Sequence, residues 1–188
     1  MLMADYSLWL VPGKSDTEAL GPLIQHLASL EAGSPPFLPH ITLWHPVPKS
    51  LPVDQIISTL ETIVQSVRQT HPLGDWHLDL ETAQTGEQYF QSVLAPVRPV
   101  PALLALRAGC EAEWGPSRKE YFPHLSLLYG DLPASRREEI AAVANARRKV
   151  GGGGDKGQLV DKVKIEEIVI VDLKGPADQW KTVGRVKV

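Results

Sequence analysis

The sequence has few cysteines, no long apolar run and no excess of basic residues, and each shortage excludes a class of protein. Its single cysteine, Cys110, cannot form an internal disulfide. A chain without disulfides is typical of a reducing compartment. No apolar run approaches the roughly 20 residues of a membrane-spanning helix, and residues 1–14 lack the pattern of a secretory signal. We therefore expect an intracellular, cytoplasmic protein without membrane insertion, and association with an organelle surface stays open.

The charge balance is slightly negative. The 19 lysines and arginines stand against 22 aspartates and glutamates, for a net charge of −3. Proteins that bind long nucleic acids neutralise many phosphates and usually carry a basic excess. The composition therefore argues against a long nucleic acid as partner and leaves a small phosphate ligand open. At 188 residues and 43% hydrophobic content, a single folded domain with a buried core is expected.

Hydrophobic periodicity predicts an order of strands and helices along the chain. Capping boxes that start at Ser15 and Ser135 are expected to open two of the helices. A turn at Gly86 is expected to join two of the strands, at 76–80 and 88–95, in a hairpin, and residues 150–158 read as a flexible glycine-rich loop. Strands are expected at 5–12, 39–44, 76–80, 88–95, 123–129, 163–173 and 180–188, and helices at 15–32, 53–67, 101–114 and 135–149.

The chain repeats itself around two similar pentapeptides, Pro39–Leu43 (PHITL) and Pro123–Leu127 (PHLSL). In each half, a strand and a helix precede the pentapeptide, and a helix and a strand follow it. This pattern predicts an α+β fold over residues 1–188, in which two intertwined lobes are related by a pseudo-twofold axis. Two antiparallel sheets would face a central cleft, with the helices packed outside.

Alternate side chains of a strand share one face. His40 and Thr42 are therefore expected to point into the cleft together, and His124 and Ser126 to do the same from the other lobe. Two imidazoles and two hydroxyls suit the hydrolysis of a cyclic phosphodiester. One neutral imidazole takes a proton from water and one protonated imidazole gives a proton to the leaving oxygen, since the ordinary pKa of histidine, about 6.5, lies near working pH. The hydroxyls bind phosphate oxygens, and neither a metal nor another cofactor is required.

Other interpretations of these residues carry less weight. A lone histidine on a strand is most often solvated, but two equivalent copies argue against that interpretation here. Within one motif the serine and histidine lie about 6.5 Å apart along the strand, too far for a direct bond, and a Ser126–His40 pair across the lobes lacks an orienting acid. A zinc site at His40, His45 and His124 lacks a nearby acidic or cysteine ligand at a recognisable spacing.

Aromatic residues near the motifs are candidates for contact with a nucleotide. Of the neighbours Tyr89 and Phe90, only one faces the cleft if both lie on a strand, and Tyr89 is favoured because its hydroxyl can reach a phosphate. Tyr129, which ends the second motif strand, is a further candidate for substrate binding. Packing in the core remains an equal alternative for both tyrosines.

The motifs resemble those of the two-histidine (2H) phosphoesterase superfamily, and the chain is most similar to its fungal-type 2′,3′-cyclic nucleotide phosphodiesterases. The stretches 7–12, 88–93 and 122–129 support this narrower match. The resemblance implies a bilobal fold with a water-filled cleft, and metal-independent opening of 2′,3′-cyclic nucleotides to 2′-phosphates. It also implies a related substrate from tRNA splicing, ADP-ribose 1″,2″-cyclic phosphate, which is opened to ADP-ribose 1″-phosphate. By position, the four residues matching its catalytic tetrad are His40, Thr42, His124 and Ser126.

Two competing functions remain open at this point. An enzyme on the same scaffold that processes RNA ends, or a 2′-5′ ligase-like enzyme, would be expected to have a basic surface. A non-catalytic nucleotide-binding module would not need two titrating imidazoles. We expect a monomer that acts on a small cyclic-phosphate nucleotide.

Overall fold

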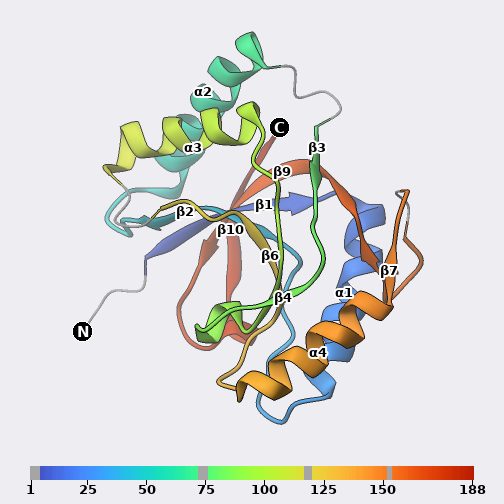
Figure 1. Cartoon of the computed structure of the whole chain (residues 1–188). Helices are drawn as coiled ribbons and strands as arrows, with labels where there is room; N and C mark the ends of the chain where they lie inside the picture. Colours follow the sequence, from blue (N-terminus) through green and yellow to red (C-terminus); the bar gives the residue numbers. More distant parts are fainter. Residues whose placement is uncertain (1–4, 72–75, 117–119, 152–153) are drawn as a thin grey trace.

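In the computed structural model, which describes residues 5–71, 76–116, 120–151 and 154–188, an eight-stranded antiparallel sheet curls between four helices (Figure 1). Among the described residues, the helices are α1 (Lys14–Ser29), α2 (Val53–Thr70), α3 (Pro101–Trp114) and α4 (Ala134–Ala146). The same residues include two 3₁₀ turns, η1 (Tyr89–Gln91) and η2 (Ala177–Gln179). The strands are β1 (Tyr6–Pro12), β2 (Ile41–Val47), β3 (His77–Asp79), β4 (Gln84–Thr85), β5 (Val93–Pro96), β6 (His124–Leu128), β7 (Arg148–Lys149), β8 (Leu159–Val160), β9 (Lys162–Asp172) and β10 (Lys181–Lys187).

The strands that carry the two motifs are neighbours in the sheet. The strand order is β10-β9-β1-β2-β6-β5-β4, with β3 paired to β9, and β7 and β8 form a separate parallel pair. β2 and β6 meet at one register pair, Ile41 opposite Leu125. The predicted α+β class and the antiparallel pairing are therefore confirmed. The two expected sheets are joined at the motif strands into one curled sheet.

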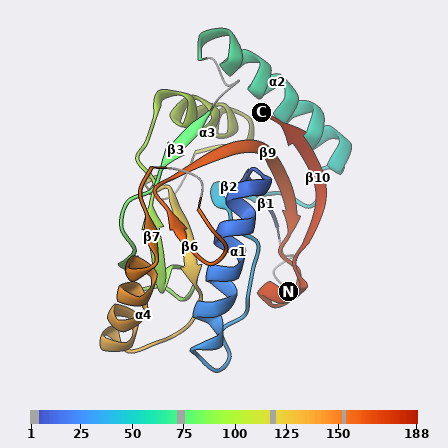
Figure 2. The ribbon, with the colours of Figure 1, turned by 90° about the vertical axis from the view of Figure 1, so that its right-hand side faces the viewer.

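The helices pack in two pairs (Figures 1 and 2). In the first pair, α2 packs against α3 and β10, and α3 also packs against β2. In the second pair, α1 packs against α4, β6 and β8. In α2, the buried residues recur at helical spacing, so one apolar face lies against the sheet, and full burial of each such side chain contributes about 1.5–3 kcal/mol. They are Ile56, Leu60, Ile63, Val64 and Val67.

The two faces of β1 belong to different apolar clusters. Leu8 and Leu10 are fully buried in the main core, beneath the helices. Trp9 and Val11 point to the opposite face and pack in a smaller cluster with residues of β9. This alternation gives the sheet a second, aromatic face, which becomes one wall of the candidate site.

Several local predictions were wrong. Residues 89–91 form η1 instead of the first half of a strand, because their backbone is hydrogen-bonded into a turn: the Gln91 amide donates to Gln88 O at 2.8 Å, and the Gly130 amide donates to Tyr89 O at 2.9 Å. The expected hairpin partner of β5 is also different. β5 pairs with β4, and β3 pairs with the distant β9.

The two capping boxes are not formed. α1 begins after Gly13 and α4 after Pro133, and neither of these N-cap residues makes a side-chain cap bond. In α4, the carbonyl of Pro133 accepts from the amides of Arg136 and Arg137 at 3.0 and 3.1 Å, so the turn is closed by backbone alone. Both helices also end about three residues before their predicted ends, at Ser29 and Ala146.

Two further expectations concern membrane-spanning helices and the glycine-rich loop. No helix within the described ranges is long and apolar enough to cross a membrane. The predicted flexible loop at 150–158 includes residues 152 and 153, which lie outside the described residues. Next to that gap, the Gly151 amide donates to Asp161 Oδ2 at 2.9 Å, and the Gly157 amide donates to Ala19 O at 2.9 Å.

Candidate active site

The two motifs present their polar side chains to the face opposite the main core. Ile41 and Leu43 of the first motif are fully buried in that core, as are Leu125 and Leu127 of the second. The intervening side chains of β2 and β6 therefore point the other way. They and the histidine that precedes β2 form the predicted set: His40, Thr42, His124 and Ser126.

The two imidazoles are held in the same way. Nδ1 of His40 lies 2.6 Å from the carbonyl oxygen of Leu38, and Nδ1 of His124 lies 2.8 Å from that of Phe122, in both cases two residues earlier in the chain. Since a carbonyl only accepts, each Nδ1 must carry the hydrogen. In the neutral imidazole, Nε2 is then an unprotonated acceptor, which suits proton transfer.

The electrostatic environments of the two histidines differ. His40 is only 5% exposed, and its ring stacks on the indole of Trp9 with centroids 3.5 Å apart and planes 9° apart. Burial lowers the pKa of His40 to about 4. The bond to Leu38 O raises that pKa in part, and the nearby charge of His124 lowers it further. His124 is only half-buried, and burial also lowers its pKa below the ordinary value.

The two hydroxyl residues differ in their neighbours. Ser126 is 5% exposed, and its Oγ donates to the carbonyl oxygen of Phe90 at 3.0 Å. Thr42 is half-buried, and its carbonyl oxygen accepts a hydrogen bond from the Tyr121 hydroxyl at 3.1 Å. The Ser126 side chain and the Thr42 backbone are thus each hydrogen-bonded to another segment of the protein.

A cavity of about 200 Å³, here called the reactive cavity, opens beside the first motif. His40, Thr42 and Tyr129 line it, whereas His124 and Ser126 are not among its lining residues. His124 is nevertheless close enough for its charge to act on His40. The complete lining is Ser7, Trp9, His40, Thr42, His45, Phe90, Tyr129, Leu173 and Trp180.

Aromatic rings form most of the wall of the reactive cavity. Tyr129 is buried and stacks on Phe37 with centroids 3.8 Å apart. The other tyrosine singled out from the sequence, Tyr89, lies in η1 and does not line this cavity, while its neighbour Phe90 does. The alternation of a strand could not place these two rings, because the segment is a 3₁₀ turn.

Sequence reasoning missed several lining residues. Ser7 and Trp9 share the site's face of β1, and Trp9 Nε1 donates to Ser7 Oγ at 2.9 Å. Their alternation on a predicted strand is a signal that could have been used. No local pattern marks Trp180, which the turn between β9 and β10 brings to the cavity.

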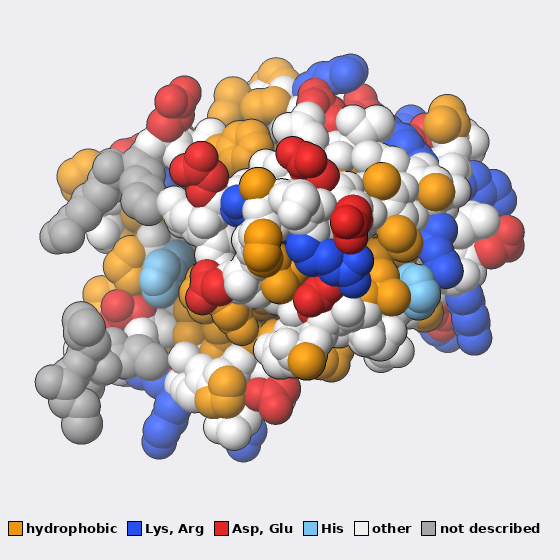
Figure 3. Space-filling model, turned by 60° about the horizontal axis from the view of Figure 1, so that its bottom comes forward, with side chains coloured by type: hydrophobic (Ala, Val, Ile, Leu, Met, Phe, Trp, Pro, Cys, Tyr) orange, Lys and Arg blue, Asp and Glu red, His pale blue; other side chains and the backbone are white. Residues whose placement is uncertain are grey.

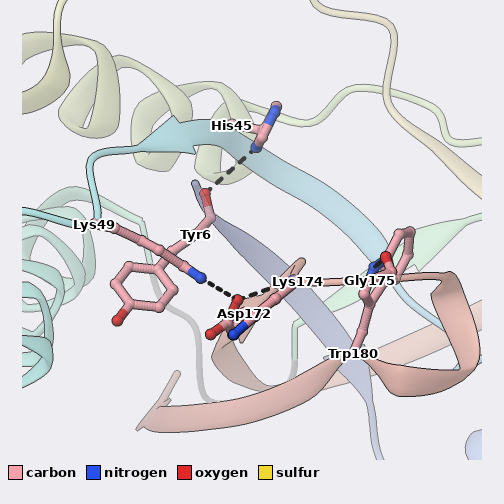
Figure 4. Close-up of polar contacts among 7 residues, drawn as sticks. All are labelled: Tyr6, His45, Lys49, Asp172, Lys174, Gly175 and Trp180. Carbon is pink, nitrogen blue, oxygen red and sulfur yellow. Dashed lines mark hydrogen bonds and ion pairs between the residues drawn. The ribbon is translucent and has the colours of Figure 1, made fainter. Parts of the chain in front are cut away.

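His45 lines the reactive cavity from its exposed edge. Its Nδ1 lies 3.4 Å from the carbonyl oxygen of Tyr6, and the ring extends away from the Lys49–Asp172 ion pair (Figure 4). Within the part of the chain that the structure describes, no three or more histidine, cysteine, aspartate or glutamate side chains are grouped as metal ligands.

Comparisons with known proteins agree with one another. The family of cyclic phosphodiesterase-like proteins matches residues 3–188. The chain is 26% identical to a 2′,3′-cyclic-nucleotide 3′-phosphodiesterase of Yarrowia lipolytica, over 95% of this chain and 97% of that protein. It is 24% identical to a protein of the same name from Saccharomyces cerevisiae, over 97% of this chain and 99% of that protein.

The fold has solved counterparts. The structure superposes on E. coli LigT in its apo form with a TM-score of 0.54 and 11% identity, over 98% of this chain and 97% of that chain. For E. coli LigT complexed with 3′-AMP the TM-score is 0.52, again at 11% identity, with 98% of each chain covered. At this identity the likeness concerns the fold.

Proposed function

Because the chain belongs to the family of cyclic phosphodiesterase-like proteins, we propose that it hydrolyses small 2′,3′-cyclic nucleotides to nucleoside 2′-phosphates. The observation that carries the proposal is the pair of imidazoles held alike, each with Nδ1 on the carbonyl two residues earlier. The fungal relatives are named 2′,3′-cyclic-nucleotide 3′-phosphodiesterases, which supports the same substrate class.

The two histidines divide the proton transfers. When one proton is shared between them, it resides on the group with the higher pKa. His40, whose pKa is lowered to about 4, is then neutral and takes a proton from the attacking water at Nε2, while protonated His124 gives a proton to the leaving oxygen. The water oxygen bonds to phosphorus as the bond to O3′ breaks. The product is the 2′-phosphate, and the two histidines have exchanged protonation states.

The hydroxyls of Thr42 and Ser126 are proposed to bind the non-bridging phosphate oxygens. Ser126 donates to Phe90 O in the free protein, so its hydrogen must turn toward the phosphate when substrate binds. Donors aimed at the developing negative charge contribute most in a site shielded from water, and aromatic rings surround this one. These residues act without a metal or other cofactor in the proposal, and activity is expected to survive EDTA.

The substrate is proposed to be small. Acidic and basic side chains are interspersed on the face drawn in Figure 3, and the net charge is −3. A long RNA is normally held by a continuous basic surface. ADP-ribose 1″,2″-cyclic phosphate is a second proposed substrate, because its five-membered cyclic phosphate offers the same bond to the same two imidazoles.

Product analysis tests this function. The purified protein is incubated with 2′,3′-cyclic AMP, and 2′-AMP is separated from 3′-AMP by chromatography. The proposal predicts 2′-AMP as the product, with and without EDTA. Turnover confined to RNA ends would favour the RNA-processing alternative. Formation of 3′-AMP would contradict the proposed direction of ring opening, and no turnover of any cyclic phosphate would support a binding module.

A further inference from the structure

A second, larger cavity of about 450 Å³ lies beside the reactive cavity. Three separate segments line it: residues 33–35 after α1, Tyr89 and Phe90 of η1, and the turn between β9 and β10. These segments gather at the lower end of the molecule in Figure 1. Phe90 and Trp180 line both cavities, so the two spaces share a wall of aromatic rings.

Aromatic rings lead continuously from the buried histidine to the second cavity. Trp9 stacks on His40 at 3.5 Å, Trp180 lies 5.7 Å from Trp9, and Phe90 lies 5.7 Å from Trp180, all between ring centroids. Phe90 is 50% exposed although two tyrosine rings also contact it. A large ring left open at the junction of two cavities is a surface on which a planar group can stack.

The volumes indicate how a nucleotide is divided between the cavities. Sites for drug-sized ligands usually enclose about 300–1,000 Å³. The reactive cavity, at about 200 Å³, is below that range and suits the cyclic phosphate with its ribose. The second cavity, at about 450 Å³, lies within the range and has room for the remaining part of the ligand.

The polar groups of the second cavity indicate which part that is. Its lining includes the Asp178 carboxylate and, among the described residues, no lysine or arginine. A carboxylate accepts hydrogen bonds from amino groups, which a nucleobase can donate. The apolar remainder, with Pro35, Pro176 and the rings, suits a flat and uncharged group.

The turn that carries Trp180 is held in place before any ligand arrives. Trp180 Nε1 donates to Gly175 O at 3.0 Å, and the Asp172 carboxylate accepts from the Lys174 amide at 2.9 Å and from Lys49 Nζ at 2.5 Å (Figure 4). A wall fixed in this way reduces the ordering cost of binding.

We propose that the second cavity is the base subsite of the enzyme, and this assignment rests on the proposed function. The nucleobase stacks on Phe90 beside Trp180 and donates its exocyclic amine to Asp178, while the cyclic phosphate occupies the reactive cavity. The subsite therefore selects bases that carry an amino group, such as adenine and cytosine, over uracil.

The test compares substrates that have a base with one that has none. Steady-state constants are measured for 2′,3′-cyclic AMP, 2′,3′-cyclic UMP and glycerol 1,2-cyclic phosphate. Phe90→Ala removes the ring and keeps the carbonyl that holds Ser126. Stacking of one base on an aromatic ring is worth about 1–3 kcal/mol, so KM for 2′,3′-cyclic AMP is expected to rise by roughly fivefold to a hundredfold. Because Phe90 also lines the reactive cavity, KM for the base-free ester is not an unchanged reference. It is expected to rise by a much smaller factor than KM for 2′,3′-cyclic AMP, and the ratio of the two factors measures the contribution of the base.

Two further measurements make the test independent of turnover of the base-free ester. Adenosine, which has a base and no phosphate, is expected to inhibit the wild type competitively and to lose affinity in Phe90→Ala by the same factor. Asp178→Asn is expected to reduce the preference for 2′,3′-cyclic AMP over 2′,3′-cyclic UMP. Leu104→Ala, at an equally open apolar position (48% exposed) that lines neither cavity, is the matched control and is expected to behave as wild type.

The outcomes separate this inference from the proposed function. If Phe90→Ala leaves KM for 2′,3′-cyclic AMP and adenosine inhibition unchanged, or weakens the base-free ester equally, the base subsite is wrong while the hydrolase stands. If the wild type hydrolyses no cyclic phosphate, the proposed function itself fails.

Discussion

The Tyr121 hydroxyl donates a hydrogen bond to the carbonyl oxygen of Thr42 at 3.1 Å and so joins the approach to the second motif to the strand of the first. Arg107 of α3 reinforces this link. Its guanidinium lies between the rings of Trp44 and Tyr121, 4.1 and 4.6 Å from their centroids, and it donates to Leu43 O at 2.7 Å. β2 and β6 share one register pair in the described sheet. The link through Tyr121 and Arg107 therefore helps to set the separation of the two histidines.

Tyr121→Phe tests this positioning role. The change removes one hydroxyl from a half-buried site and keeps the ring on Arg107, so the free energy of unfolding is expected to fall by only about 1 kcal/mol. We expect kcat to fall by roughly threefold to tenfold while KM changes little, because the phosphate still binds but the imidazoles are less well placed.

Tyr6→Phe is the control, since the Tyr6 ring lies under Lys49 (Figure 4) and does not line the reactive cavity. A change in thermal stability for Tyr121→Phe with kcat equal to that of wild type would show that the hydroxyl is structural only.

The pH dependence of kcat/KM reports on the two imidazoles. His40 must be neutral, and burial lowers its pKa to about 4, so activity is expected to fall below that value. His124 must be protonated, and burial lowers its pKa below the ordinary 6.5, so activity is expected to decline as the pH rises through that pKa. The expected profile is a bell with its maximum on the acidic side of neutrality. Steady-state rates across this range check it, and a maximum in alkaline solution would contradict the assignment of acid and base.

The buried imidazole of His40 also makes the free energy of unfolding depend on pH, and this dependence can be measured without an activity assay. The pKa of His40 is about 4 in the folded protein, against the ordinary 6.5. The unfolded chain thus binds more protons between these values, and the free energy of unfolding falls as the pH drops from 6.5 toward 4, by about 3 kcal/mol in all.

His40→Asn removes this effect. Its melting temperature is expected to fall less than that of wild type between about pH 7 and pH 4.5, measured by circular dichroism. His26→Asn in α1 is the control and should follow the wild type. Equal acid sensitivity in wild type and His40→Asn would show that His40 is not the buried neutral group described here.

Local patterns were enough to predict much of the fold and of the motif geometry. The bounds of α3, Pro101–Trp114, and the burial of Ile41 and Leu125 follow from periodicities of neighbouring residues. The stack of Trp9 on His40 does not, because it depends on the register of β1 and β2, in which Trp9 lies opposite Thr42. That register is set by tertiary packing.

Segments held by distant partners could not be placed from sequence. The conformation of η1 depends on the bond from Gly130 to Tyr89 O, and the position of β3 depends on its pairing with β9. Trp180 comes to the site only because β10 returns along β9 and the intervening turn carries the indole to Phe90. Each contact joins residues far apart in the chain, which a short sequence window does not encode.

The acid–base role of the two imidazoles is tested by the rate at which His40→Ala and His124→Ala hydrolyse 2′,3′-cyclic AMP. Loss of general acid–base catalysis typically costs about 10²–10⁴-fold, so kcat of each variant is expected to fall by at least about two orders of magnitude. His26→Ala, with its histidine on α1, should retain the wild-type rate. Near-wild-type hydrolysis by either His40→Ala or His124→Ala would contradict a mechanism that needs both imidazoles.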